Sequence, residues 1–106
     1  DVFERQKNSR TITEELCSIY SESIPIVSTG SVWCAEDAQF VLDQGAQAVG
    51  VARAALPHPD WASLVNDPSY NPSRPPFAPE ELLTAQLSPT FVDYMRRWKG
   101  FVTDGR

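Results

Sequence analysis

The sequence predicts an α/β fold built around one parallel strand–helix–strand unit over residues 24–56. Two short apolar runs, 24–29 and 46–51, are rich in β-branched or small residues, which is typical of strands buried on both faces. Between them, residues 35–44 have a helical pattern, and Gly45 fits the position just after a helix. Because few residues connect these segments, the strands should be parallel with a right-handed crossover.

The composition indicates a globular chain and argues against several classes of protein. Of 106 residues, 42% are hydrophobic and 22% are charged, which is enough apolar material for a core and argues against general disorder. The net charge of -5 argues against nucleic-acid binding, because neutralising a phosphate backbone needs surplus Lys and Arg. No apolar run approaches the roughly 18–20 residues of a membrane span, and no signal peptide is recognisable. We therefore expect a cytoplasmic protein without a membrane partner.

Two features concern the chain as a whole. It begins with Asp1 rather than Met, which leads us to expect a piece of a longer protein. Its cysteines, Cys17 and Cys34, are expected to be thiols in a reducing compartment rather than one disulfide.

The residues before the first strand predict a single helix after a polar, irregular start. Thr11 and Glu14 have the spacing of a capping box, which places the helix start there. The helix should end near Ser23, because Pro25 disfavours helical geometry in the residue before it. An apolar stripe at helical spacing indicates a packing face made of Ile12, Leu16, Ile19 and Tyr20.

The ends of the two predicted strands carry the candidate binding residues. Gly30 and Ser31 follow the first strand, where a glycine either makes a turn or lets a phosphate approach the backbone N–H groups. Ala52 and Arg53 follow the second strand, where the arginine needs either an internal acidic partner or an anionic ligand. The binding interpretation requires the two loops to hold one phosphate between them.

Residues 57–78 form a proline-rich loop in this interpretation. Asp60 is a candidate N-cap for a short helix through Val65. His58 is the only histidine, so a metal site is not expected, and we predict a solvent-exposed turn residue. No nucleophile–histidine arrangement is convincing, because His58 would have to act alone.

Residues 79–99 are predicted to form the C-terminal helices. Pro79 suits the first position of a helix that runs through Gln86, and Ser88 suits the N-cap of the next. That second helix carries an aromatic and apolar stripe at helical spacing, expected to be core or interface, made of Phe91, Met95 and Trp98.

Six stretches, taken in order, resemble the C-terminal part of the old yellow enzyme family of NADH:flavin oxidoreductases. They are Ile-Pro-Ile-Val-Ser-Thr-Gly-Ser-Val at 24–32, Ala-Glu-Asp-Ala at 35–38, Gln-Gly-Ala at 44–46, Ala-Val-Gly-Val-Ala-Arg at 48–53, His-Pro-Asp-Trp at 58–61, and Pro-Thr-Phe-Val-Asp-Tyr-Met-Arg-Arg-Trp-Lys-Gly-Phe-Val at 89–102. The family consists of (β/α)8 barrels that bind FMN.

The resemblance implies that residues 1–106 are the C-terminal fragment of such a barrel, namely strands 7 and 8 with flanking and C-terminal helices. It implies FMN as cofactor, NADH or NADPH as reductant and a small-molecule substrate. Gly30, Ser31, Ala52 and Arg53 would bind the FMN phosphate, in line with the phosphate site common after strands 7 and 8 of such barrels. No catalytic residue would lie in this fragment. The rest of the barrel would be its partner, and the isolated fragment is expected to self-associate through open strand edges.

Three positions depart from the family pattern. Ala52 replaces a common glycine and is expected to crowd the phosphate, Cys34 replaces a Ser or Thr helix cap, and Gln47 replaces a common aspartate. Two alternatives stay open: a non-enzymatic interaction module that docks a partner on the Phe91/Met95/Trp98 stripe, and a piece of another phosphate-binding barrel enzyme.

Overall fold

The computed structural model describes residues 1–20 and 22–103, and its order of elements is that of the predicted α/β unit followed by helices. The chain folds into an elongated body of 44 × 30 × 23 Å. Within the described residues, the elements are α1 (Ile12–Tyr20), β1 (Val27–Thr29), α2 (Ala35–Asp43), β2 (Ala48–Gly50), α3 (Trp61–Leu64), α4 (Pro79–Thr84) and α5 (Pro89–Met95).

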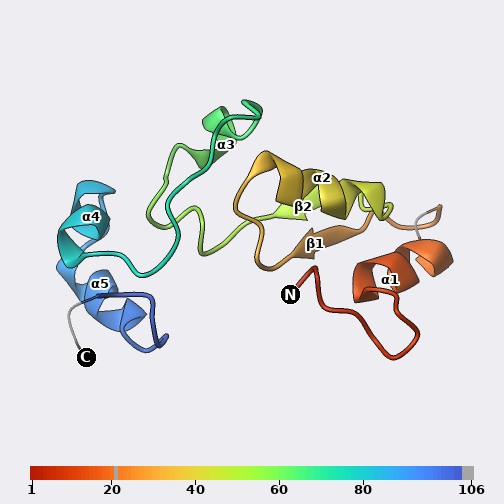
Figure 1. Ribbon diagram of the computed structural model, residues 1–106, viewed down its shortest axis with the longest axis horizontal. Coiled ribbons are helices and arrows are strands. Elements are labelled where there is room, and N and C mark those ends of the chain that lie inside the picture. The colour runs from red at the N-terminus through yellow and green to blue at the C-terminus, as the bar shows by residue number, and fades with distance from the viewer. Residues whose placement is uncertain (21, 104–106) are drawn as a thin grey trace.

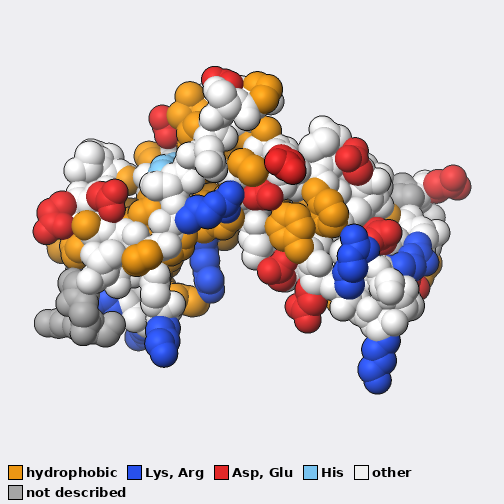
Figure 2. Space-filling model, viewed as in Figure 1, with side chains coloured by type: hydrophobic (Ala, Val, Ile, Leu, Met, Phe, Trp, Pro, Cys, Tyr) orange, Lys and Arg blue, Asp and Glu red, His pale blue; other side chains and the backbone are white. Residues whose placement is uncertain are grey.

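The two strands are parallel, as the strand–helix–strand pattern predicts. Val27 pairs with Ala48, Ser28 with Val49 and Thr29 with Gly50. Helix α2 connects them, and α1 and α2 lie beside the sheet at one end of the molecule (Figure 1). Helices α4 and α5 lie at the other end, with α3 between the two parts (Figure 1). Figure 2 shows an arch that is hollowed on its underside between these parts.

The burial of the strands differs from the prediction. They are shorter than expected, and β1 is not buried on both faces: the Val27 side chain is 62% exposed. Ser28 faces the helices, because its hydroxyl hydrogen-bonds with that of Thr13 over 2.6 Å. Successive side chains of a strand point to opposite faces, so one face of this two-stranded sheet has no covering layer among the described residues.

Helix α1 begins as predicted but packs through a different face. The Thr11 hydroxyl accepts the Glu14 N–H over 3.1 Å, and a Glu14 carboxylate oxygen accepts the Thr11 N–H over 3.2 Å, so the capping box is confirmed. The buried helical residues are Thr13 and Cys17. The predicted apolar packing stripe was wrong, because its members are exposed: Ile12 60%, Leu16 40%, Ile19 59% and Tyr20 45%.

Several predicted helix ends are confirmed. Gly45 follows the C-cap of α2 with φ +107°, a backbone region that favours glycine. Pro79 opens α4, and the Ser88 hydroxyl accepts the Phe91 N–H over 3.1 Å at the start of α5. Asp60 occupies the N-cap of α3, yet its side chain forms no cap bond, because its φ of -95° and ψ of 12° are not the extended geometry that a capping side chain needs.

Two hydrophobic clusters form the core. The first gathers residues of α1, α2, α3 and the loops around the strands, and the second joins α4, α5 and the chain's last described residues. Trp33 packs against both clusters and so connects the two ends of the arch. Both cysteines are free thiols, Cys17 buried and Cys34 half-buried. Among the described residues, no helix has the length and apolar character needed to cross a membrane.

Candidate functional site

A cavity of about 480 Å³ lies where β1 and β2 end, and we call it the strand-end cavity. The carboxyl ends of parallel strands meet at one edge of a sheet, so the loops that follow them share this space. It is lined by Asp1, Thr29, Gly30, Ser31, Val32, Trp33, Gly50, Val51, Ala52, Arg53, Ala54 and Pro75. All four predicted binding residues, Gly30, Ser31, Ala52 and Arg53, are therefore brought to one cavity, although their role in binding stays a prediction.

Gly30 and Ser31 adopt left-handed backbone conformations, with φ of +132° and +65°. A side chain at Gly30 would lie 3.2 Å from the Asp1 Cα, and the Gly30 carbonyl accepts the Val2 N–H over 3.2 Å. The missing side chain of Gly30 thus accommodates the backbone of Asp1 on that side. This contact is a different use of the glycine from the predicted approach of a phosphate.

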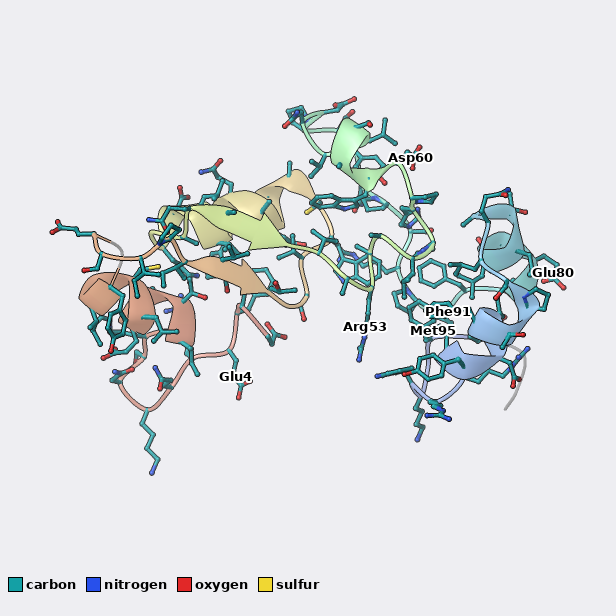
Figure 3. The ribbon with its side chains drawn as sticks, turned by 180° about the vertical axis from the view of Figure 1, so that it is seen from behind. Glu4, Arg53, Asp60, Glu80, Phe91 and Met95 are labelled. Carbon is teal, nitrogen blue, oxygen red and sulfur yellow. The ribbon has the colours of Figure 1, made fainter. Side chains whose placement is uncertain are left out.

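Charges of both signs line the strand-end cavity. The Ser31 hydroxyl donates to the Asp1 carboxylate over 3.1 Å, which places a negative charge beside the loop. Within residues 1–20 and 22–103, Arg53 forms neither a hydrogen bond nor an ion pair, so the internal salt bridge considered for it is absent from that part of the chain. Figure 3 shows Arg53 extending from the loop after β2, away from the ribbon. Its guanidinium is available to an anion.

Gly50 lines the cavity beside Thr29, its partner in the sheet. A side chain at Gly50 would collide with the Thr29 hydroxyl. Position 50 therefore has no room for a side chain while Thr29 is its partner. Sequence spacing does not reveal this constraint, because only strand pairing brings the two residues together.

The loop after β1 is held by contacts that the sequence did not indicate. The Asp37 carboxylate accepts the N–H groups of Trp33 and Cys34 over 2.9 and 3.3 Å. Asp37, at the N3 position of α2, thus supplies the N3 half of a capping box. The Trp33 carbonyl accepts the indole N–H of Trp61 over 2.9 Å. Arg74 reaches the same loop from the proline-rich segment.

Two residues outside the strand-end cavity, His58 and Gln47, make contacts that stabilise the fold. His58 is half-buried rather than solvent-exposed as predicted, because its ring packs edge-on against Phe77 at 6.0 Å between centroids. Its Nε2 lies 2.9 Å from the Ser73 carbonyl oxygen, which can only accept, so this nitrogen donates. No cluster of three or more metal-ligating side chains occurs among the residues that the structure describes. Gln47 ties the strands together, since its side-chain oxygen accepts the Ile26 N–H over 2.6 Å.

The fold and the strand-end cavity define a class: an α/β chain with parallel strands whose following loops meet at one cavity, as in the last units of a TIM barrel. The family described as "Dihydrouridine synthase (Dus)" matches residues 4–102, and the chain belongs to this family. Family membership supports the superfamily of FMN-dependent oxidoreductases with a TIM-barrel fold, and the described residues contain two parallel strands.

One curated relative supports the same superfamily. The chain is 33% identical over 57 residues to "NADH:fumarate oxidoreductase" of Klebsiella pneumoniae (strain 342). The match covers 51% of this chain and 6% of the relative, so the chain spans a small part of that protein's length. No solved structure matches.

Proposed function

We propose that this chain supplies the phosphate end of the FMN site in a flavin-dependent oxidoreductase that takes electrons from NADH or NADPH. One observation carries the proposal: Gly30, Ser31, Ala52 and Arg53 come from two loops and line the same cavity. Membership of a family of FMN-binding barrels supports it.

The residues present fit a phosphate group. Arg53 lines the cavity and pairs with no residue of 1–20 or 22–103, and a guanidinium can meet phosphate oxygens with two parallel hydrogen bonds. Ser31 offers a hydroxyl that the Asp1 carboxylate holds in the structure, so a phosphate would have to compete for it. The methyl group of Ala52 lies in the same cavity and narrows it. When bound, FMN supplies the hydride chemistry, and the residues of this chain bind and orient it.

The proposed substrate is a small molecule with an activated carbon–carbon double bond. Fumarate, named for the Klebsiella relative, is an alkene conjugated to carboxyl groups. Dihydrouridine, named for the family, is uridine with its ring double bond reduced, and that bond is conjugated to a carbonyl. Both names therefore describe the same class of reaction. An old-yellow-enzyme type of alkene reduction is the finer form of this proposal, and uridine reduction is the second candidate.

The open face of the sheet supports a role within a larger barrel. Ser28 contacts α1 and Val49 packs against the first cluster, so the alternating residues point to the other face. That face carries Val27, Thr29, Ala48 and Gly50. We propose that the remaining strands of the barrel cover it as the partner of this chain.

An FMN titration tests the proposal. Arg53→Ala should weaken FMN binding by about 10–100-fold, the loss of one charge-assisted interaction, while Arg53→Lys should retain part of it. Ala52→Gly should strengthen binding, because it removes the methyl group from the cavity. Arg10→Ala is the matched control, since Arg10 pairs with Glu15 at 3.3 Å on α1. Unchanged FMN affinity in Arg53→Ala would refute the role of Arg53.

Turnover separates the two candidate substrates. A full-length protein that contains this chain, loaded with FMN and NADH, is supplied with fumarate or with uridine, and oxidation of NADH is followed. Faster oxidation with fumarate supports the small-alkene assignment, and faster oxidation with uridine supports the second candidate.

A further inference from the structure

Arg74 connects the proline-rich loop to the loop after β1. Its guanidinium carbon lies 5.5 Å from the centroid of the Trp33 ring, over the ring face. One of its nitrogens lies 3.9 Å from Oδ2 of Asp37. The side chain is 47% exposed, so the contact lies at the surface of the molecule.

The same oxygen of Asp37 accepts two hydrogen bonds besides its ion pair with Arg74. They come from the backbone N–H groups of Trp33 and Cys34, over 2.9 and 3.3 Å. These N–H groups belong to the segment that leads from β1 into α2. Asp37 therefore holds the backbone of Trp33, while Arg74 holds its ring.

Both loops joined by this contact line the strand-end cavity. Trp33 lines the cavity from the loop after β1, and Pro75, the residue after Arg74, lines it from the proline-rich loop. Arg74 itself is absent from the lining and borders a separate surface hollow with Asp37 and Tyr70. It acts on the cavity through Trp33 and Pro75 and not by touching a ligand there.

We propose that Arg74 is a positioning residue for the strand-end cavity: stacked on Trp33 and paired with Asp37, it holds two walls of the cavity at the separation that FMN phosphate binding requires. The proposal rests on the proposed function. A planar guanidinium suits the double task, because it stacks on an indole face while its charged edge lies beside a carboxylate. A lysine keeps the charge but not the planar stack.

Two readouts on the full chain test the proposal: the dissociation constant for FMN, from flavin fluorescence, and the amide chemical shifts of residues 30–34. Arg74→Ala should weaken FMN binding by about 3–10-fold, the sum of a surface cation–π contact and a partly exposed ion pair. It should also shift the amides of residues 30–34. Arg74→Lys should fall between Arg74→Ala and wild type. Arg10→Ala, which removes a paired arginine of similar exposure (43%), should change neither readout.

The proposal is overturned if Arg74→Ala gives the same FMN affinity and the same amide shifts as Arg10→Ala. If circular dichroism shows that Arg74→Ala does not fold, Arg74→Lys decides: weaker FMN binding with shifted amides supports the proposal, and wild-type behaviour in both refutes it. If wild type binds no FMN, the proposed function fails, and the amide shifts alone then decide whether Arg74 positions the loop.

Discussion

The indole N–H of Trp61 donates a hydrogen bond to the backbone carbonyl of Trp33 over 2.9 Å. Trp61 belongs to α3 in the proline-rich segment, and Trp33 belongs to the loop after β1. Because Trp33 packs against both hydrophobic clusters, this bond fixes the residue that joins the two ends of the arch. It also sets the backbone of a wall of the strand-end cavity.

Trp61→Phe is expected to destabilise the chain by about 1–3 kcal/mol, the cost of leaving the Trp33 carbonyl without its donor. Urea denaturation measures this change in the free energy of unfolding. Trp98→Phe is the control, because the Trp98 indole N–H has no hydrogen-bond partner within residues 1–20 and 22–103. An equal loss of unfolding free energy in the two variants would show that the smaller ring accounts for the whole effect and that the Trp61 hydrogen bond adds nothing.

Gly45→Ala is expected to destabilise the chain by roughly 1–3 kcal/mol, because the position has a positive φ. A methyl group there would also lie 3.0 Å from the Cys17 Cβ of α1. Gly100→Ala is a matched control, since Gly100 has φ +83° and no atom within 4 Å of the added carbon. The difference between the two variants in thermal denaturation isolates the contact with Cys17. Equal destabilisation in the two variants would mean that α1 shifts away from the added methyl group at no cost in free energy.

Tyr70→Phe is expected to stabilise the chain by about 1 kcal/mol at neutral pH. The Tyr70 hydroxyl is buried and finds no hydrogen-bond partner in the described part of the chain. Removing it removes the cost of keeping a polar atom from water. Tyr20→Phe, on an exposed ring of α1, should leave the free energy of unfolding unchanged. A destabilised Tyr70→Phe would show that the hydroxyl has a partner in solution.

The same residue predicts a pH dependence. Burial raises the pKa of Tyr70 above the ordinary value of 10.0, and the nearby Asp60 carboxylate raises it further. The unfolded chain therefore loses this proton at lower pH than the folded chain does. The contribution of Tyr70 to the free energy of unfolding is fully present below pH 10.0. It should fall as the pH rises from there towards the folded-state pKa. In Tyr70→Phe the free energy of unfolding should decline less with pH, which urea denaturation below and above pH 10.0 would measure. An equal decline in both proteins would contradict the prediction.

The exposed apolar surface predicts self-association of the isolated chain. Ile19 and Val27 are 59% and 62% exposed, and no third strand pairs with β1 or β2 among the described residues. Sedimentation at micromolar concentration should show oligomers, and Ile19→Glu should shift them towards monomer. Leu83→Glu, at a 43% exposed position on α4, is the control and should have a smaller effect. A monodisperse wild-type monomer would contradict the prediction.

Much of the local structure was predictable, because it depends on residues close together in the sequence. The Thr11–Glu14 capping box, the glycine after α2, the proline that opens α4 and the Ser88 cap each involve neighbours within one helical turn. The parallel strand pair followed from two apolar runs around one helix. That pairing then brought Gly30 and Arg53 to a single cavity.

Tertiary structure alone decided which faces are covered and what holds the cavity walls. The α1 stripe has the spacing of a packing face, yet Thr13 and Cys17 are buried instead, because burial depends on which elements are present to cover a face. Trp33, Asp37, Trp61 and Arg74 meet only through the path of the proline-rich loop. Spacing along a chain reports contacts within a helix turn or along a strand, whereas contacts between distant segments arise from the three-dimensional path of the loops.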